Sequence, residues 1–294
     1  MKTAILHLLA ALCLTVTVVV PLRAADKTKI ESDVVYGHKD GMALTFDVIR
    51  PAKPTGAGIL WIQSGGWYSN WVDPKVWPLL CKPYLDKGFT MFIVRHGSAP
   101  KYTVPEVTED VRRSVRFIRL KAKDFGIDPN QLGVFGGSAG GHLSLMLGTT
   151  GDDGNPNAKD EVLKQGDRVA AVVAIFPPTD ISDWVTNPPE EIKKLAMLKP
   201  PLTFDAKLAP EYSPLLKVTA KTAPTLLIHG DKDKLVPIEH SQKMLAAMEK
   251  AKVPCKLVVV EGGGHGFNLK QDQQIVLPAM LEWFEKYLAD KKEK

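Results

Sequence analysis

A serine set among glycines, in the segment 136–142, is the part of this 294-residue sequence best suited to chemistry. The segment reads Gly-Gly-Ser-Ala-Gly-Gly-His, which places Ser138 in a G-x-S-x-G pattern. An apolar run at 132–135 precedes it and a helix-like run at 143–147 follows it, as a sharp strand-to-helix turn requires. The start of the helix would offer unpaired N–H groups to a developing negative charge. We predict that Ser138 is a nucleophile; a glycine-rich structural turn is the alternative.

A serine hydroxyl is a weak nucleophile and needs a base, which in turn needs a carboxylate to hold it. Among the seven histidines, His265 lies in Glu-Gly-Gly-Gly-His-Gly-Phe after an apolar run, where the glycines leave its ring free to approach a serine. His142 follows Ser138 by one helical turn and is expected to point away from the hydroxyl. His229 and His96 end predicted strands, so His229 is expected to pack beneath the site and the role of His96 stays open. We predict that His265 is the base.

The carboxylate has two candidates in the run 229–237, which reads His-Gly-Asp-Lys-Asp-Lys-Leu-Val-Pro just past a predicted strand. Asp233 lies further into the loop and can reach the histidine loop of the next strand. Asp231 adjoins the strand end, where it is better placed to accept hydrogen bonds from loop N–H groups. We therefore favour Asp233 as the partner of His265.

Oxyanion stabilisation is expected from the loop Gln63-Ser64-Gly65-Gly66-Trp67, which follows the first predicted parallel strand. Backbone N–H groups stabilise an oxyanion best when no side chain blocks them, so we predict that Gly65, Gly66 and Ala139 donate there. Trp67 is a candidate wall of the substrate site, together with Trp71 and Trp184, although burial in the core explains each of the three equally well.

The elements that would position these residues follow from apolar runs and helical spacing. A hairpin is expected where Asp40-Gly41 joins two extended segments. The strand segments are 31–38, 42–50, 58–62, 89–94, 132–135, 169–176, 225–229 and 257–260, and the helical ones 75–87, 106–123, 143–147, 238–250 and 273–288. Strands that are apolar on both faces and alternate with helices predict an α/β fold with a mostly parallel central sheet covered on both faces.

Two segments interrupt this alternation. The polar stretch 151–160 has some features of a calcium loop, but its glycine and final glutamate are misplaced, so a solvent-exposed loop is favoured. The proline-rich stretch 177–224 lies between two predicted strands on the side where the site loops gather, and we predict that it is an inserted lid.

The N-terminus is typical of an export signal, with Lys2, an apolar run over residues 4–20 and small residues before a cleavage site after Ala24. An uncleaved anchor is the alternative. Residues 25–294 would then form a single domain, exported to the periplasm or outside the cell. Cys81 and Cys255 remain, and two buried thiols are favoured over a disulfide. The net charge of +5 is spread over amphipathic helices, which argues against nucleic-acid binding.

The order Ser138, Asp233, His265 is that of α/β-hydrolases. With the oxyanion loop, the run 229–237 and Gly-His-Gly-Phe at 264–267, the chain resembles α/β-hydrolase-fold serine esterases, nearest to exported acetyl-esterase and feruloyl-esterase-like enzymes bordering the prolyl-oligopeptidase group. The resemblance implies a carboxylic-ester hydrolase acting without a metal or cofactor on a small-molecule or oligosaccharide ester, with acetyl or feruloyl groups on carbohydrate as the expected substrates.

One departure concerns the oxyanion loop, since these esterases usually have His-Gly-Gly-Gly where this chain has Gln63-Ser64-Gly65-Gly66. Gln63 keeps hydrogen-bonding groups with which to brace the loop. Two other functions stay open: a small serine peptidase of prolyl-oligopeptidase type, although such relatives usually carry a propeller domain, and a hydrolase-fold binding protein without turnover.

Overall fold

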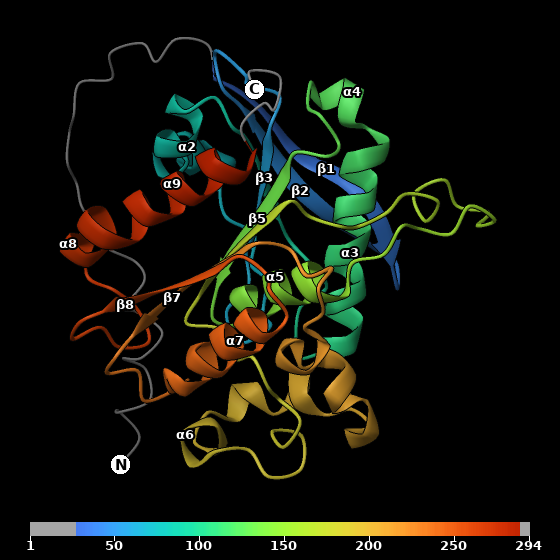
Figure 1. The fold of residues 1–294 in the computed structure, drawn as a ribbon. Helices are drawn as coiled ribbons and strands as arrows, with labels where there is room; N and C mark the ends of the chain where they lie inside the picture. The colour runs from blue at the N-terminus through green and yellow to red at the C-terminus, as the bar shows by residue number, and fades with distance from the viewer. Residues whose placement is uncertain (1–27, 289–294) are drawn as a thin grey trace.

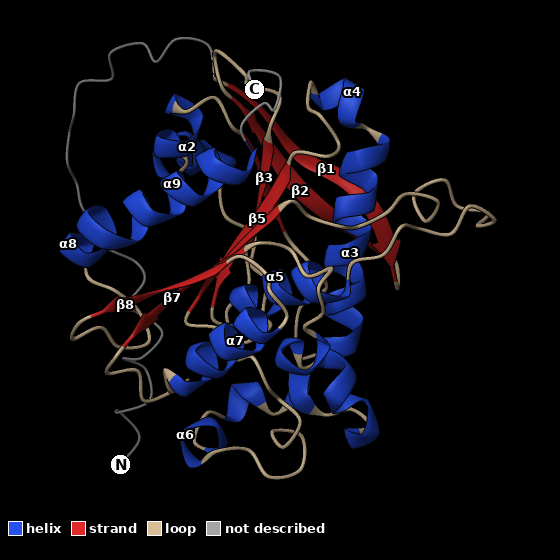
Figure 2. Ribbon diagram, viewed as in Figure 1, coloured by secondary structure: helices blue, strands red, loops and turns tan. Residues whose placement is uncertain are grey.

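The apolar runs assemble into one eight-stranded sheet in the computed structural model, which describes residues 28–288 (Figure 2). The predicted export signal and its cleavage site lie outside the described residues. The strands are β1 (Lys29–Lys39), β2 (Met42–Arg50), β3 (Gly58–Ile62), β4 (Thr90–Val94), β5 (Leu132–Gly137), β6 (Ala171–Ile175), β7 (Thr225–Gly230) and β8 (Cys255–Val260). Their order in the sheet is β1-β2-β4-β3-β5-β6-β7-β8. The strands from β4 to β8 in this order pair in parallel, whereas β1 and β2 form an antiparallel edge, so the predicted mostly parallel sheet is confirmed.

The antiparallel edge depends on a two-residue turn between β1 and β2. Asp40 and Gly41 both have positive φ angles, 49° and 80°. Two-residue hairpin loops need this backbone twist, which aspartate tolerates and glycine adopts freely. The turn therefore fixes the register in which Lys39 pairs with Met42.

Helices cover both faces of the sheet (Figure 1). Along β4, Phe92 and Val94 belong to one buried cluster and Met91 and Ile93 to the other, as expected for a strand that is buried on both sides. The first cluster includes α3 (Val104–Leu120), α5 (Ala139–Thr150) and α7 (Glu239–Lys250), and the second includes α1 (Trp77–Leu80), α2 (Lys82–Asp86) and α9 (Leu277–Leu288). Within residues 28–288, no helix combines the length and apolarity needed to cross a bilayer.

Prolines divide two segments that the sequence predicts as single helices. Segment 75–87 forms the separate helices α1 and α2, each with a proline in its first turn, Pro78 and Pro83. Segment 273–288 begins with a π-helical stretch, Asp272–Val276, that follows α8 (Leu269–Gln271) and leads into α9. Proline has no N–H to continue the regular hydrogen-bond ladder, and Pro278 lies where that ladder changes.

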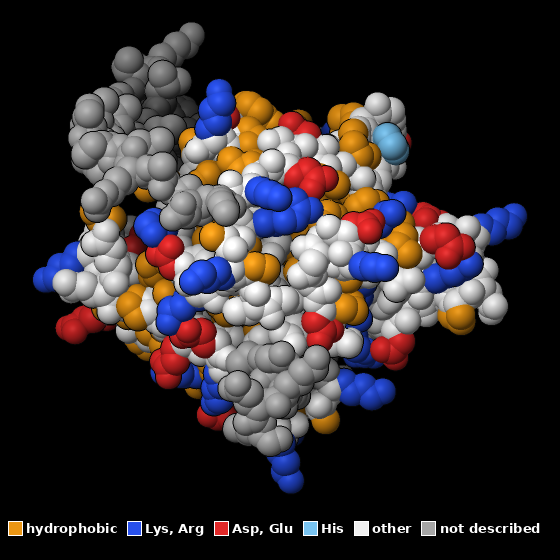
Figure 3. Space-filling view, turned by 90° about the horizontal axis from the view of Figure 1, so that it is seen from above, with side chains coloured by type: hydrophobic (Ala, Val, Ile, Leu, Met, Phe, Trp, Pro, Cys, Tyr) orange, Lys and Arg blue, Asp and Glu red, His pale blue; other side chains and the backbone are white. Residues whose placement is uncertain are grey.

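The polar stretch after α5 is a loop fixed by arginines. Asp152 is 2.8 Å from Arg116, and Asp153 is 2.7 Å from Arg168. These guanidinium groups form ion pairs with the carboxylates that a calcium loop would need as ligands. The structure therefore agrees with the solvent-exposed loop that the sequence favours. On the face shown in Figure 3, acidic and basic side chains are interspersed.

The segment 177–224 is a group of short helices beside α5 and α7, yellow to orange in Figure 1. It comprises α6 (Glu190–Lys193) and the 3₁₀ helices Ala196–Leu198, Pro200–Leu202, Ala206–Tyr212 and Pro214–Lys217. We call this segment the insertion. Frequent prolines keep its helices short, because each one interrupts the backbone hydrogen bonding.

Cys81 and Cys255 are both free thiols; Cys81 is buried, as the sequence analysis favoured, whereas Cys255 is half-buried. Cys81 is part of the cluster on the α2 and α9 face, whereas Cys255 packs against the cluster on the opposite face of the sheet. Burial raises the pKa of each thiol to about 12. Both behave as small apolar side chains that stay protonated.

Candidate active site

Ser138 occupies a strained turn between β5 and α5. Its φ and ψ angles are 53° and −121°, a conformation that residues with a side chain rarely adopt. Its N–H donates to the carbonyl oxygen of Ile175 on the neighbouring strand, at 2.8 Å. A Cβ atom at Gly136 would lie 2.5 Å from the backbone of Gly140, and one at Gly140 would lie 2.6 Å from the carbonyl oxygen of Ile62. The two glycines of the motif are therefore required so that strand and helix can approach this closely.

A chain of hydrogen bonds connects Ser138, His265 and Asp233. The Nε2 atom of His265 is 2.8 Å from the Oγ atom of Ser138, and its Nδ1 atom is 2.7 Å from the Oδ2 atom of Asp233. Because a carboxylate only accepts, Nδ1 carries the proton and Nε2 is free to accept the serine hydroxyl proton. The three residues follow β5, β7 and β8, which end at the same edge of the sheet. The structure thus brings together the three residues that the sequence selected.

The carboxylate of Asp233 is enclosed and held on both oxygens. Its Oδ1 atom accepts the N–H groups of Leu235 and Val236, each at 2.9 Å. Burial by itself raises the pKa of this carboxyl, but hydrogen bonds from His229 and His265 outweigh it and hold the pKa well below its usual range. Asp233 therefore remains an anion beside His265.

His229 packs beneath the site, as expected from the sequence, but its contact with Asp233 was not predicted. Its Nε2 atom is 2.8 Å from the carbonyl oxygen of Val236 and 3.3 Å from the Oδ2 atom of Asp233. Its Nδ1 atom is 2.7 Å from the hydroxyl of Ser241 on α7. The ring thereby fixes the loop that carries Asp233 to both β7 and α7. The spacing of four residues between His229 and Asp233 is the signal that could have revealed this contact.

Asp231 has the different position that the sequence predicted. Its Oδ1 atom accepts the N–H of Gly262 at 2.7 Å, which connects the loop after β7 to the loop that carries His265. Asp233, in contrast, reaches the ring itself. Asp233 thus contacts the ring of His265, whereas Asp231 braces the loop that carries it.

The oxyanion loop is only partly available to donate. The N–H of Gly65 donates to the carbonyl oxygen of Tyr68 at 3.0 Å, so this predicted donor is already used inside the loop. Gly66 has a φ of 58° and no acceptor for its N–H among the residues the structure describes. Ala139 is the first residue of α5, where N–H groups lack helical partners. Gly66 and Ala139 are therefore the better placed of the three predicted donors.

Gln63 does not provide the brace expected of it. Its side-chain Oε1 atom is buried without a hydrogen-bond partner in the described structure, as is the hydroxyl of Ser64. The loop is held by backbone contacts instead: the N–H of Gln63 donates to Val94 at 3.0 Å, and the N–H of Gly140 donates to Ser64 at 3.2 Å. The loop is thus held by main-chain hydrogen bonds and not by the side-chain oxygen of Gln63.

Trp67 is not an open wall of the substrate site, which corrects that prediction. Its side chain is 2% exposed and belongs to the core cluster on the α5 face. A buried indole needs an acceptor for its N–H, and the Nδ1 atom of His142 provides it at 3.4 Å. Of the other two candidates, Trp184 is mostly buried but lines a cavity beside α7, whereas Trp71 is 61% exposed.

His96 is buried just after β4 and forms no hydrogen bond with Ser138, Asp233 or His265 in the described part of the chain. Its Nδ1 atom is 2.7 Å from the carbonyl oxygen of Gly97. Burial lowers the pKa of His96 to about 4, so the ring is neutral.

Within residues 28–288, no group of three or more histidine, cysteine or acidic side chains is arranged to hold a metal ion.

A serine, histidine and aspartate at the ends of β5, β8 and β7 of such a sheet define the class of the protein as an α/β-hydrolase. Within this class, the chain belongs to the BD-FAE family, whose model matches residues 46–248. A second family model, described as TAP-like protein, matches residues 206–292.

Several of the relatives are named esterases. The chain is 30% identical to Esterase LipC of Mycobacterium tuberculosis, over 80% of this chain and 59% of that protein. It is 27% identical to acetylxylan esterase of Xylanibacter ruminicola, over 74% of this chain and 42% of that protein. The chain thus spans about three fifths or less of the length of these relatives. An acetyl ester-xyloside bifunctional hydrolase from Caldicellulosiruptor lactoaceticus has a similar solved structure, with a TM-score of 0.72, 26% identity, and 87% of this chain and 96% of that chain covered.

Proposed function

We propose that the protein is a serine hydrolase that cleaves carboxylic esters. The observation that carries the proposal is the continuous hydrogen-bond chain from Ser138 through His265 to Asp233, at 2.8 and 2.7 Å. Membership of the BD-FAE family and the esterase names of the relatives support the same reaction.

In the proposed reaction, the Oγ atom of Ser138 attacks the ester carbonyl carbon while the Nε2 atom of His265 takes its proton. Asp233 holds the ring in this tautomer and stabilises its positive charge. The N–H groups of Gly66 and Ala139 stabilise the oxyanion. His265 then gives its proton to the leaving alcohol oxygen, and an acyl group remains on Ser138. A water molecule, activated by His265, hydrolyses this acyl-enzyme and restores the serine.

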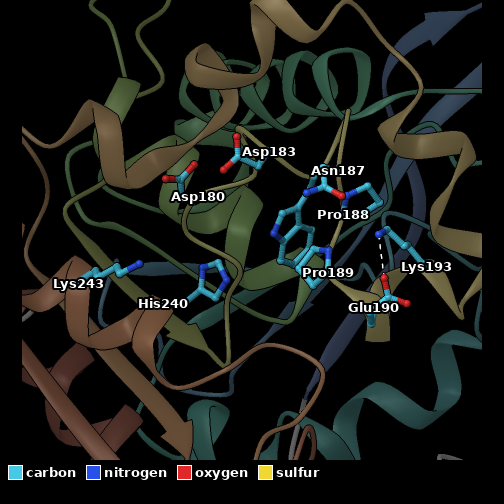
Figure 4. A pocket seen from close by; sticks show the side chains of 10 residues that line it. Asp180, Asp183, Asn187, Pro188, Pro189, Glu190, Lys193, His240 and Lys243 are labelled. Carbon is cyan, nitrogen blue, oxygen red and sulfur yellow. Dashed lines mark hydrogen bonds and ion pairs between the residues drawn. The ribbon is translucent and has the colours of Figure 1, made fainter.

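The alcohol part of the substrate is proposed to be a carbohydrate. A cavity of about 460 Å³ lies between the insertion and α7 (Figure 4). Asp180, Asp183 and Asn187 line it from the insertion, and His240 and Lys243 line it from α7. Sugar hydroxyl groups both donate and accept, and this lining offers acceptors and donors together.

The location of this cavity suits the part of the substrate that does not react. None of the three triad residues lines it. Asp180 follows β6 and His240 follows β7, so both lie beyond the edge of the sheet from which Ser138 and His265 also project. Ligands of parallel sheets bind beyond this edge. We therefore propose that the sugar chain extends toward this cavity while its acetyl group lies at Ser138.

Two experiments test the function. A fluorophosphonate probe should label the native protein at Ser138, and the Ser138→Ala variant should not react; a native protein that stays unlabelled would exclude an active serine hydrolase. Acetylated and feruloylated xylo-oligosaccharides should then be compared with p-nitrophenyl acetate. Asp183→Ala and Lys243→Ala should lower kcat/KM for the oligosaccharide that is used and leave p-nitrophenyl acetate unaffected. Equal effects on both substrates would contradict the carbohydrate assignment.

We also propose that the protein is exported, on the strength of its N-terminal sequence. Fractionation of cells that express the full chain should place a product shortened by about 24 residues outside the cytoplasm. Retention of the full-length product in the membrane fraction would favour the uncleaved anchor instead.

A further inference from the structure

His142 connects three parts of the protein that the proposed reaction brings together. It lies on α5, four residues after Ser138, and is fully buried. On one side, its Nδ1 atom is 3.4 Å from the indole nitrogen of Trp67, next to Gly66 in the oxyanion loop. On the other, its Nε2 atom is 2.8 Å from the carbonyl oxygen of Tyr212 in the insertion. No step of the proposed reaction uses this ring.

The partners of His142 determine its protonation. An indole N–H only donates and a carbonyl oxygen only accepts, so Nδ1 must be unprotonated and Nε2 must carry the hydrogen. Burial lowers the pKa of His142 to about 4, which agrees with a neutral ring. Each ring nitrogen therefore has one suitable partner, and loss of either partner would leave a buried polar group unsatisfied.

Trp67 is the residue through which this ring reaches the oxyanion loop. Gly66 and Trp67 have successive positive φ angles, 58° and 62°, and such a conformation is costly for a tryptophan unless its surroundings hold it. The carbonyl oxygen of Trp67 accepts the N–H of Ala99 at 3.2 Å, and its indole donates to His142. These contacts hold Trp67, the residue that directly follows Gly66, in place.

The insertion also contacts this loop from the outside. The hydroxyl of Tyr68 donates to the carbonyl oxygen of Met197 at 3.0 Å. A Cβ atom at Gly66 would lie 2.6 Å from the end of the Leu198 side chain, which shows how closely the insertion approaches this loop. The oxyanion loop therefore has a contact to the insertion on one side and to His142 on the other.

We propose that His142 is a positioning residue, which holds Trp67 and with it the Gly66 donor in place while the insertion is docked through Tyr212. Its effect would be on the proposed ester hydrolysis, so the inference rests on that function. Oxyanion donors act mainly when charge develops on the oxygen, so a displaced donor lowers kcat more than it changes KM.

Three substitutions at this position separate the two hydrogen bonds. Leucine removes both of them and keeps a similar volume. Asparagine places its amide near the position of Nδ1 and can still accept from Trp67, whereas glutamine extends to the position of Nε2 and can still donate to Tyr212. Ser144→Ala is the matched control, because Ser144 is buried on α5 but its hydroxyl bonds only to Gly140.

With p-nitrophenyl acetate, His142→Leu and His142→Gln should lower kcat about tenfold with little change in KM, since loss of a whole donor costs about 10²–10³. His142→Asn should recover most of this loss, and Ser144→Ala should keep the native kcat. Trp67→Phe, which removes only the indole N–H donor, should lower kcat about as much as His142→Leu, and the double variant should lose little more. Affinity for a boronic acid that forms a tetrahedral adduct should fall in parallel with kcat.

Equal losses in the asparagine and glutamine variants, or a native kcat in His142→Leu, would overturn the proposal. If His142→Leu does not fold, as judged from its thermal unfolding, Trp67→Phe decides the question, and an unchanged kcat there would overturn it. A native protein without ester turnover would instead contradict the proposed function itself.

Discussion

Replacing Asp233 with asparagine tests the proposed mechanism most directly, because the surroundings of this side chain permit only one orientation of an amide. The Oδ1 atom accepts two backbone N–H groups, from Leu235 and Val236, each at 2.9 Å. An amide NH₂ group placed there would face two donors, so the asparagine oxygen must occupy this position. Its NH₂ group must then face the Nδ1 atom of His265, where Oδ2 now lies at 2.7 Å.

This orientation would reverse the tautomer of the histidine. Nδ1 would have to accept from the amide, and the proton would move to Nε2, which lies 2.8 Å from the Ser138 hydroxyl. A ring that carries a proton at Nε2 cannot take one from the serine. The wrong tautomer in a triad of this kind costs about 10⁴ in kcat, which corresponds to about 5.5 kcal/mol in activation free energy.

The assay is steady-state hydrolysis of p-nitrophenyl acetate, with thermal unfolding of each variant measured alongside. Asp231→Asn is the matched control, because Asp231 accepts a single N–H from Gly262 and an amide oxygen can replace it. We expect this control to lose less than about threefold in kcat. If Asp233→Asn lost less than about tenfold, or if the control lost more than Asp233→Asn, the assignment of the carboxylate would be refuted.

Three further predictions follow from the same contacts. Ser138→Ala and His265→Ala should each lower kcat by about 10⁴-fold or more, and the double variant should lose little beyond either, because the residues act as a unit; losses that multiply would show that they do not share a proton transfer. Gln63→Ala should keep kcat within about twofold, because its side-chain oxygen has no partner, and a tenfold loss would show that Gln63 does brace the loop. Burial lowers the pKa of His96 and His142 to about 4, so the unfolded chain binds protons first as the pH falls and the free energy of unfolding should decrease from about pH 6.5 to about pH 4. Thermal unfolding across this range should show a shallower decrease in His96→Asn, and an equally steep one would contradict the assignment.

The sheet could be predicted from the sequence because most of its strands are buried on both faces. Such strands appear as short unbroken apolar runs, and segment 58–62 forms β3 with the predicted bounds. The helices were less predictable where Pro83 and Pro278 interrupt a continuous apolar pattern. A helical periodicity shows which face of a helix is buried, but it does not show where the backbone hydrogen bonds are interrupted and a new helix must begin.

The three residues of the triad could be chosen from the sequence because glycines and strand ends limit where each can lie. The surroundings of the oxyanion loop could not be predicted in the same way. Trp67 and His142 are 75 residues apart, and no local pattern shows that an indole meets this ring. The hydrogen bond between Gly65 and Tyr68 likewise depends on backbone angles that residue types do not determine.

The backbone of Ser138 has a consequence for how this protein can evolve and be engineered. Its φ of 53° and ψ of −121° cost about 1–3 kcal/mol for a residue with a side chain, whereas glycine adopts such angles freely. A Ser138→Gly change should thus relieve this backbone strain while removing the proposed nucleophile. The strain at this position therefore opposes the proposed nucleophile, and a requirement for turnover would explain why a serine is kept there. Substitutions meant to raise the thermal stability of the protein should leave this turn unchanged and be made in the surface helices instead.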